Sequence, residues 1–266
     1  MNTSVRELAQ AIGGEWVKLR SVRSTWWCLA CTTALMVLGS LAIGGGTVTE
    51  MVRRDLAGTL SASDPVTSAT AFAQFGLVAL AMLTITPEYA SGGIRTTLQA
   101  TPIRGRVLAA KALVLAPVTF VAGVVAAGVA TAVVHLVLSA EVFGGRVTAP
   151  PAEVVPDLLG VGVFLALVSV TTLGVGVATR SAAGTLTTAF MLLMGAPLLL
   201  VMTGTSIGFE ASLRMPLFAG LAFMGSSDTP MGGPVPYPAT QGLVWLLVWA
   251  AAATVAGYAV LRRRDA

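Results

Sequence analysis

The sequence is poor in charged residues, which make up 11% of its 266 positions, whereas hydrophobic residues make up 55%. A soluble domain usually carries about 25% charged residues. The mean hydropathy of +0.84 agrees with this imbalance. A shortage of charge on this scale excludes an ordinary water-soluble domain.

Lysine and histidine are also scarce, and their scarcity excludes two kinds of catalytic site. The two lysines, Lys18 and Lys111, do not follow glycine, so the sequence contains no phosphate-binding loop of the form G-x-x-x-x-G-K-[ST]. One histidine, His135, is too few for the H-E-x-x-H motif of zinc proteases. Cys28 and Cys31 lie in an apolar stretch without a second ligand pair, where they are best interpreted as small hydrophobic side chains. We therefore expect no catalytic residue, metal or cofactor in this chain.

Six long stretches of the chain contain no Asp, Glu, Lys or Arg. A helix of about 20 apolar residues crosses the hydrocarbon core, where only helices and closed barrels satisfy their backbone hydrogen bonds. The sequence thus predicts an all-α, polytopic membrane protein, with a six-span transmembrane domain over residues 26–266. The spans cover about 26–43, 68–86, 112–138, 158–179, 184–203 and 241–261. Buried helices of a large soluble protein would need charged outer faces, which these stretches lack.

Basic residues are unevenly distributed between the loops. With six spans, twelve of the 16 basic residues fall on the side that carries both termini, and eight of the 12 acidic residues fall on the other side. Because cytoplasmic loops are enriched in Lys and Arg, we expect both termini to be cytoplasmic. The net charge of +4 follows from this asymmetry and from attraction to lipid, so it does not indicate nucleic-acid binding. Abundant Arg, Ala, Gly and Val suit a GC-rich bacterial genome. Together with the spans, this leads us to expect a multi-pass protein of the bacterial plasma (inner) membrane.

Residues 1–25 differ from the spans, because apolar residues recur there at helical spacing and basic residues fall mostly on other faces. This pattern predicts an amphipathic connecting helix that lies on the cytoplasmic surface of the membrane. The Gly13–Gly14 pair predicts a break in it. A partly disordered basic tail is the alternative. The residues expected at the membrane interface are Leu8, Ile12, Trp16, Leu19, Trp26 and Trp27.

The loop between the second and third spans, residues 88–111, is the most informative stretch. Gly92–Gly93 ends the preceding element, Ile94 and Leu98 lie four residues apart on one helical face, and Thr101–Pro102 is a helix start. A short helix between two breaks, facing the cytoplasm among basic residues, is suited to docking on another protein. The alternative is an ordinary basic anchor that follows the positive-inside rule.

The outer loop of residues 205–240 contains many apolar residues that do not belong in water, interrupted by glycines and Pro216. This pattern predicts short helices that dip back into the outer leaflet and pack against the spans. A Gly- and Pro-rich stretch over residues 228–239 then returns the chain to the last span.

Together these segments resemble the membrane-spanning subunit, or permease, of an ABC-2 type ABC transporter over essentially the whole chain. The resemblance is carried by EWVKLRSVRSTWW (Glu15–Trp27), by EYASGGIRTTLQATP followed by RGRVLAAKAL in the second loop, by VATRSAAG between the fourth and fifth spans, and by the re-entrant-like outer loop. Such permeases have six spans and cytoplasmic termini, which agrees with the charge distribution.

The resemblance implies a mechanism. Two permease subunits, alike or different, would pair in the membrane, and each would dock a separate ATP-binding subunit that holds ATP and Mg²⁺. The N-terminal helix would correspond to the connecting helix of the family, and the second loop to its coupling helix. Contacts to the ATP-binding subunit would then come from Glu88, Tyr89, Ile94, Arg95, Thr96 and Leu98. The direction of transport implied by the family is export.

Two other classes of function remain open on the sequence. A passive channel or facilitator would transport without an ATP-binding partner. A structural or regulatory membrane subunit would signal to a partner and move no substrate. Few polar residues lie inside the spans and no chain of acidic residues forms a proton relay, which argues against a proton-driven pump.

Overall fold

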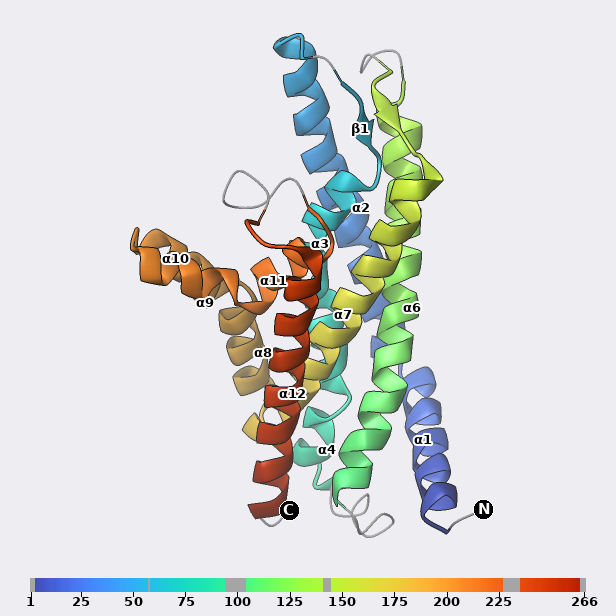
Figure 1. Cartoon of the computed structure of the whole chain (residues 1–266). Coiled ribbons are helices and arrows are strands. Elements are labelled where there is room, and N and C mark those ends of the chain that lie inside the picture. The colour runs from blue at the N-terminus through green and yellow to red at the C-terminus, as the bar shows by residue number, and fades with distance from the viewer. Residues whose placement is uncertain (1–2, 57, 94–103, 141–144, 227–234, 264–266) are drawn as a thin grey trace.

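The computed structural model describes residues 3–56, 58–93, 104–140, 145–226 and 235–263. Within these residues the chain is almost entirely helical, and six helices are long and apolar enough to cross a membrane. They run side by side, and both chain termini lie at one end of the bundle, which we call the terminal end (Figure 1). This confirms the prediction of an all-helical chain with six membrane-spanning candidates.

The first half of the chain forms α1 (Thr3–Ser21), α2 (Arg23–Arg53), α3 (Asp64–Leu83), α4 (Thr86–Ala90) and α6 (Arg104–Leu138). The second half forms α7 (Pro151–Thr179), α8 (Ala182–Phe190), α9 (Ala196–Met202), α10 (Ser206–Leu213), α11 (Pro216–Phe223) and α12 (Ala239–Arg263). One π-helical turn, η2 (Met191–Gly195), joins α8 to α9 within the fifth span. Two short parallel strands, β1 (Leu60–Ser61) and β2 (Val147–Thr148), pair at the far end from the termini (Figure 1).

Several helices continue past the charge-free stretches. The first span continues from Ile43 to Arg53, where the Glu50 carboxylate pairs with Arg53 at 2.6 Å and with Arg54. The third begins at Arg104, within the predicted loop of residues 88–111. Absence of charge marks only the part suited to hydrocarbon, whereas a helix can extend into water when its charged side chains pair or are solvated.

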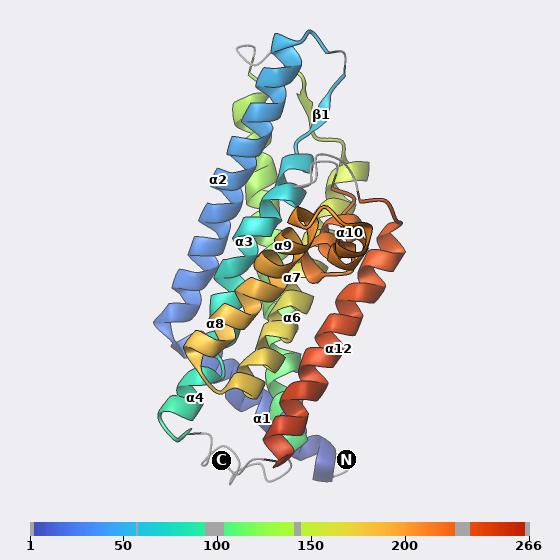
Figure 2. The same ribbon diagram turned by 90° about the vertical axis from the view of Figure 1, so that its left-hand side faces the viewer.

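The buried core of the bundle lies along α3 and α7, which expose much less of their surface than the other spans. α2 and α6 pack on one side of this pair, and α12 packs on α7 (Figures 1 and 2). Gly174 of α7 and Gly257 of α12 lie where the two helix backbones approach most closely. The small side chains of these spans therefore serve helix packing, as is common in membrane bundles.

The N-terminal helix α1 is continuous through Gly13–Gly14, so the predicted break is wrong. A Cβ at either glycine would meet nothing within 4 Å, so neither is required by packing. The helix remains continuous because the face opposite the two glycines packs along α6. This packing outweighs the roughly 1 kcal/mol per residue by which glycine weakens a helix.

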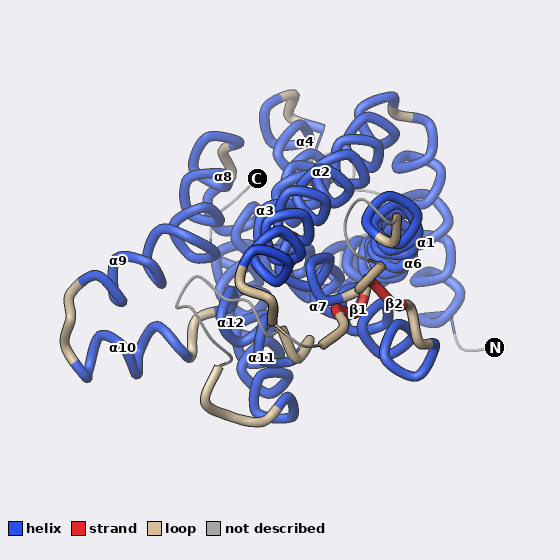
Figure 3. The backbone as a smooth tube through the Cα atoms, turned by 90° about the horizontal axis from the view of Figure 1, so that it is seen from above, coloured by secondary structure: helices blue, strands red, loops and turns tan. Residues whose placement is uncertain are grey.

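Residues 205–226 form two short helices, α10 and α11, which differ in how far they are buried. α11 is buried from Pro216 to Ala222 and packs on α12, α3 and α7. α9 and α10 project sideways from the bundle as a pair (Figure 3) and expose apolar side chains, among them Met202 and Ile207. The π turn and Pro197 precede this change of direction, as expected for interruptions of the helical hydrogen-bond ladder.

The corner between α10 and α11 is held by side chains of the last span and of the segment just before it, which donate to backbone carbonyls of the corner. Tyr237 Oη donates to Leu213 O, and Trp249 Nε1 donates to Arg214 O at 2.8 Å. The Arg214 guanidinium lies 6.0 Å from the Trp245 ring centroid. Burial raises the pKa of Tyr237 to about 12, although the charge of Arg214 opposes this shift.

The Tyr237 contact predicts a loss of stability at high pH. In the unfolded chain the phenol ionises near pH 10. Because the folded state keeps the proton up to about pH 12, the contribution to stability is complete below pH 10 and is lost as the pH rises toward 12. A spectrophotometric titration of tyrosinate should show one phenol ionising near pH 12, and Tyr237→Phe should remove that step. A wild-type titration that is complete by pH 11 would contradict this prediction.

Candidate functional site

The short helix α4 lies at the terminal end of the bundle, directly after α3 (Figure 2). Thr86 and Pro87 begin it, with Pro in the first turn, where its missing N–H costs nothing. Its neighbouring side chains Glu88 and Tyr89 reach different parts of the bundle. Glu88 contacts α1 and α6, whereas Tyr89 contacts the turn between α7 and α8. α4 is therefore connected to both sides of the bundle.

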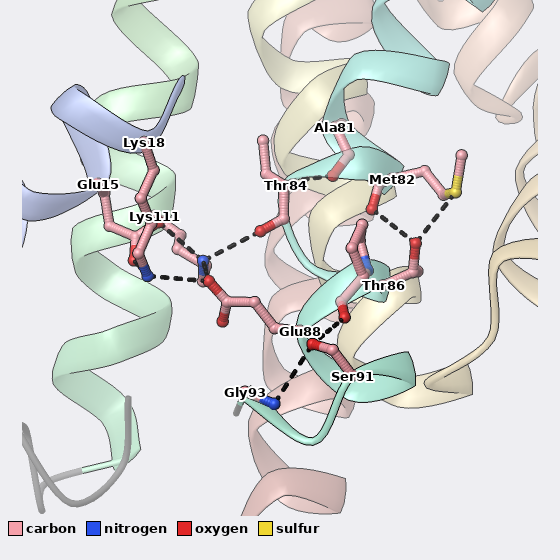
Figure 4. A network of polar contacts seen from close by, with 11 residues as sticks. Glu15, Lys18, Ala81, Met82, Thr84, Thr86, Glu88, Ser91, Gly93 and Lys111 are labelled. Carbon is pink, nitrogen blue, oxygen red and sulfur yellow. Dashed lines mark hydrogen bonds and ion pairs between the residues drawn. The ribbon is translucent and has the colours of Figure 1, made fainter. Parts of the chain in front are cut away.

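Glu88 belongs to a network of two carboxylates and two ammonium groups (Figure 4). Lys111 Nζ of α6 donates to Glu88 Oε1 at 2.8 Å, to Glu15 Oε2 at 2.7 Å and to Thr84 O at 3.0 Å. Lys18 Nζ of α1 donates to Glu15 Oε1 and to Glu88 Oε1, both at 3.0 Å. The network thus joins α1, the α3–α4 segment and α6, and its formal charges sum to zero.

The two lysines share both carboxylates but differ in burial. The Lys111 side chain is 1% exposed and its three donors are all used. The Lys18 side chain is 51% exposed. Burial lowers the pKa of Lys18, but hydrogen bonds to Glu15 and Glu88 and the charges of these residues outweigh it and raise the pKa overall. Lys111 is therefore the buried cation that both partly buried carboxylates share.

Tyr89 links α4 to the opposite side of the bundle. The Arg180 guanidinium lies 5.2 Å from the Tyr89 ring centroid, and Arg180 Nη2 also donates to Val260 O of α12 at 3.5 Å. Arg180 has a positive φ of 54° and ends α7, where its amide donates to Gly176 O at 2.9 Å. Ser181 then caps α8 by accepting from Gly184 N. The VATRSAAG turn thus brings a cation between α4 and α12.

The predicted interface residues of the N-terminal region fall into two groups. Leu8, Ile12 and Leu19 are partly buried, and α1 packs on α6. Trp16, Trp26 and Trp27 are exposed, by 48%, 60% and 76%. Of the six predicted residues, the three tryptophans thus have the largest free surface for contact with lipid. Contact with a membrane itself stays a prediction.

The predicted contacts to an ATP-binding subunit are described only in part. Glu88 and Tyr89 are engaged within the chain, whereas Pro87 and Ala90 of α4 and Ser91 directly after it are exposed. Ile94, Arg95, Thr96 and Leu98 lie outside the described residues, as does the predicted helix start at Thr101–Pro102. The docking of another protein on this loop therefore stays a prediction.

Sequence reasoning missed Glu15, Lys111 and Arg180 as members of the site. The sequence places Lys111 at the end of the predicted basic loop of residues 88–111, but it is buried within α6. One signal was present in the sequence. Lys18 precedes the first span and Lys111 ends the second loop, so both lysines fall on the side of the termini, where acidic residues such as Glu15 and Glu88 are rare. Comparison with models of known protein families and with curated proteins found no match.

Proposed function

We propose that the chain is the permease subunit of an ABC-2 type transporter in the bacterial plasma membrane, with both termini in the cytoplasm. The observation that carries the proposal is the position of α4: it lies at the terminal end, between the second and third spans, and its side chains contact both sides of the bundle. A helix in this position can receive a displacement from outside the membrane and pass it to several spans at once. A second permease subunit, alike or different, would complete the pathway.

In the proposed mechanism, a separate ATP-binding subunit docks on the loop that follows α4. Closure of two such subunits around ATP would move α4. Through Glu88 and Lys111 the displacement would reach α6 and α1, and through Tyr89 and Arg180 it would reach α12. Because packed helices shift between discrete arrangements, a small movement at α4 would reorient the spans. Export is the direction that the family resemblance favours.

The first experiment is a mild-detergent pull-down of the tagged protein from its native membrane, with mass spectrometry of the partners. A stoichiometric soluble partner with a phosphate-binding loop would support the proposal, and transport by the reconstituted complex should then require ATP. Transport without any ATPase would favour a passive facilitator. A stable partner without transport would favour a structural or regulatory subunit.

The coupling loop yields a prediction for the same experiment. Replacing Ile94 and Leu98 together with Asp should reduce the co-purified ATP-binding subunit at least tenfold, because buried unpaired carboxylates are costly at an interface. The control is Leu56→Asp, an exposed position at the other end of the bundle, which should keep the wild-type yield. If the double variant also keeps that yield while its circular dichroism is unchanged, the coupling-helix assignment is wrong.

Orientation in the membrane is tested by cysteine labelling. In a background with Cys28→Ala and Cys31→Ala, Asp55→Cys and Pro150→Cys should react with an impermeant maleimide in intact cells. Ala100→Cys and Asp265→Cys should react only after permeabilisation, because basic loops are retained in the cytoplasm. The opposite labelling pattern would overturn the proposed topology and the docking side with it.

A further inference from the structure

A cavity of about 200 Å³ lies beside the ionic network, between α1, α3 and α6. Apolar side chains form much of its wall, namely Leu19, Leu80, Leu83, Val114 and Leu115, and the four charged residues of the network, Glu15, Lys18, Glu88 and Lys111, line it as well. Of the lining residues, Lys111 is 1% exposed, whereas Lys18 in the last turn of α1 and Val22 between α1 and α2 are about half exposed. Apolar walls favour apolar guests, and the four charged residues of the lining are already paired with one another. The cavity is therefore suited to a hydrocarbon chain that enters at the α1–α2 turn.

The turn at this opening is held in a fixed conformation. Thr25 Oγ1, which lines the cavity, donates to Leu19 O at 2.7 Å, and Trp26 Nε1 donates to Arg20 O at 3.4 Å. Both bonds bring the end of α1 against the first turn of α2. Trp26 and Trp27 remain exposed beside it, which is typical of the depth at which lipid head groups meet the hydrocarbon core.

The same turn is positively charged and has little to compensate that charge. Arg20 and Arg23 are exposed, and α2 has no acidic residue in its first turn and no side-chain cap at Val22. The amides of that first turn carry the positive end of the helix dipole. Lys18 uses two of its donors on Glu15 and Glu88, so a third can face the opening. These groups favour an anionic phosphate beside the apolar cavity.

We propose that this cavity is a specific site for one anionic phospholipid. An acyl chain would occupy the apolar part, and the phosphate would lie at the turn, near Arg20, Arg23 and the first amides of α2. Bound lipid would hold α1 against α6 beside the network that reaches α4. The site rests on the membrane-spanning arrangement of the bundle, but it does not require an ATP-binding partner.

The test is native mass spectrometry of the full-length protein, purified in mild detergent and then offered phospholipids with identical acyl chains and either an anionic or a zwitterionic head group. Wild-type protein should retain one anionic lipid per chain, with at least tenfold lower occupancy by the zwitterionic lipid. Leu83→Trp, which fills the cavity, should reduce the retained lipid at least tenfold. The matched control Leu136→Trp, at an exposed position of α6, should retain it.

A separate double variant tests the proposed preference for an anionic head group. Arg20→Gln combined with Arg23→Gln should bring the two lipids to nearly equal occupancy and leave binding of the acyl chain in place.

If Leu83→Trp does not fold, Ser24→Trp at the opening tests the same cavity from α2. Wild-type protein without retained lipid, or a folded cavity-filling variant with wild-type occupancy, would overturn the site. Equal occupancy by both lipids in wild-type protein would overturn the anionic head group. An ATP-binding subunit that still co-purifies with the cavity variants shows that a failure here leaves the proposed function intact.

Discussion

Lys111→Met should destabilise the protein by about 3–5 kcal/mol, because it leaves two largely buried carboxylates with one exposed cation between them. Methionine keeps the length of the side chain, so the variant removes the charge and little volume. Lys18 provides the matched control within the same network, since it contacts the same two carboxylates. Because its side chain is 51% exposed, Lys18→Met should cost only about 0–1 kcal/mol.

The two lysine variants are compared by unfolding them in mixed micelles with increasing dodecyl sulfate, with tryptophan fluorescence as the readout. A double variant then isolates the electrostatic part of the effect. Adding Glu88→Gln to Lys111→Met leaves one carboxylate for one ammonium group, so it should restore about 1 kcal/mol or more rather than destabilise further. Equal losses from the two lysines, or an additive loss in the double variant, would show that the network is not held by the buried charge.

The same variants separate a structural role of the network from a role in coupling. Hydrogen exchange of the α1 amides should increase strongly in Lys111→Met and little in Lys18→Met, because the network fastens α1 to α6. If α4 transmits displacement as proposed, Glu88→Gln should still capture the ATP-binding subunit while transport falls. Loss of capture would instead indicate that Glu88 contacts the partner directly.

The spans could be predicted from the sequence because the signal is local. Each of the six helices contains a stretch without charge, and membrane hydrocarbon excludes charge wherever it occurs. The ends of the helices could not be predicted in this way. The charges of Arg104 and Lys111 put them in the predicted loop of residues 88–111, yet both are helical. A helix can include Lys111 because its charge is paired with Glu15 of α1 and Glu88 of α4.

The ionic network could not be derived from the sequence, because its partners lie far apart in it. Glu15 and Lys111 are 96 residues apart, and Lys18 and Glu88 are 70 residues apart. Neither residue type nor spacing distinguishes a buried lysine from a basic anchor, since both follow the positive-inside rule. Only the packing of α1 on α6 decides which of the two lysines loses contact with solvent.

The second large loss of stability is expected at the contact between α7 and α12, where one added methyl group should be enough to cause it. A Cβ at Gly174 would lie 2.5 Å from the backbone carbon and oxygen of Ala253 and 2.7 Å from Thr254 N. These are backbone atoms, so no side-chain rotation can relieve the overlap and α12 must move. Small residues at membrane helix crossings permit this close approach. Gly174→Ala should therefore destabilise the bundle by about 1–3 kcal/mol or more.

Gly45→Ala is the matched control for this substitution, because it also adds one methyl group inside a spanning helix. A Cβ there meets nothing within 4 Å, and alanine favours a helix over glycine by about 1 kcal/mol. The control should thus be neutral or slightly stabilising in the same micelle unfolding experiment. Since α12 accepts the Arg180 contact at Val260, displacement of α12 should also weaken the link to α4. If the chain is a permease as proposed, Gly174→Ala should therefore reduce transport more than capture of the ATP-binding subunit. If Gly174→Ala is as stable as Gly45→Ala, the two helix backbones do not approach as closely as the structure places them.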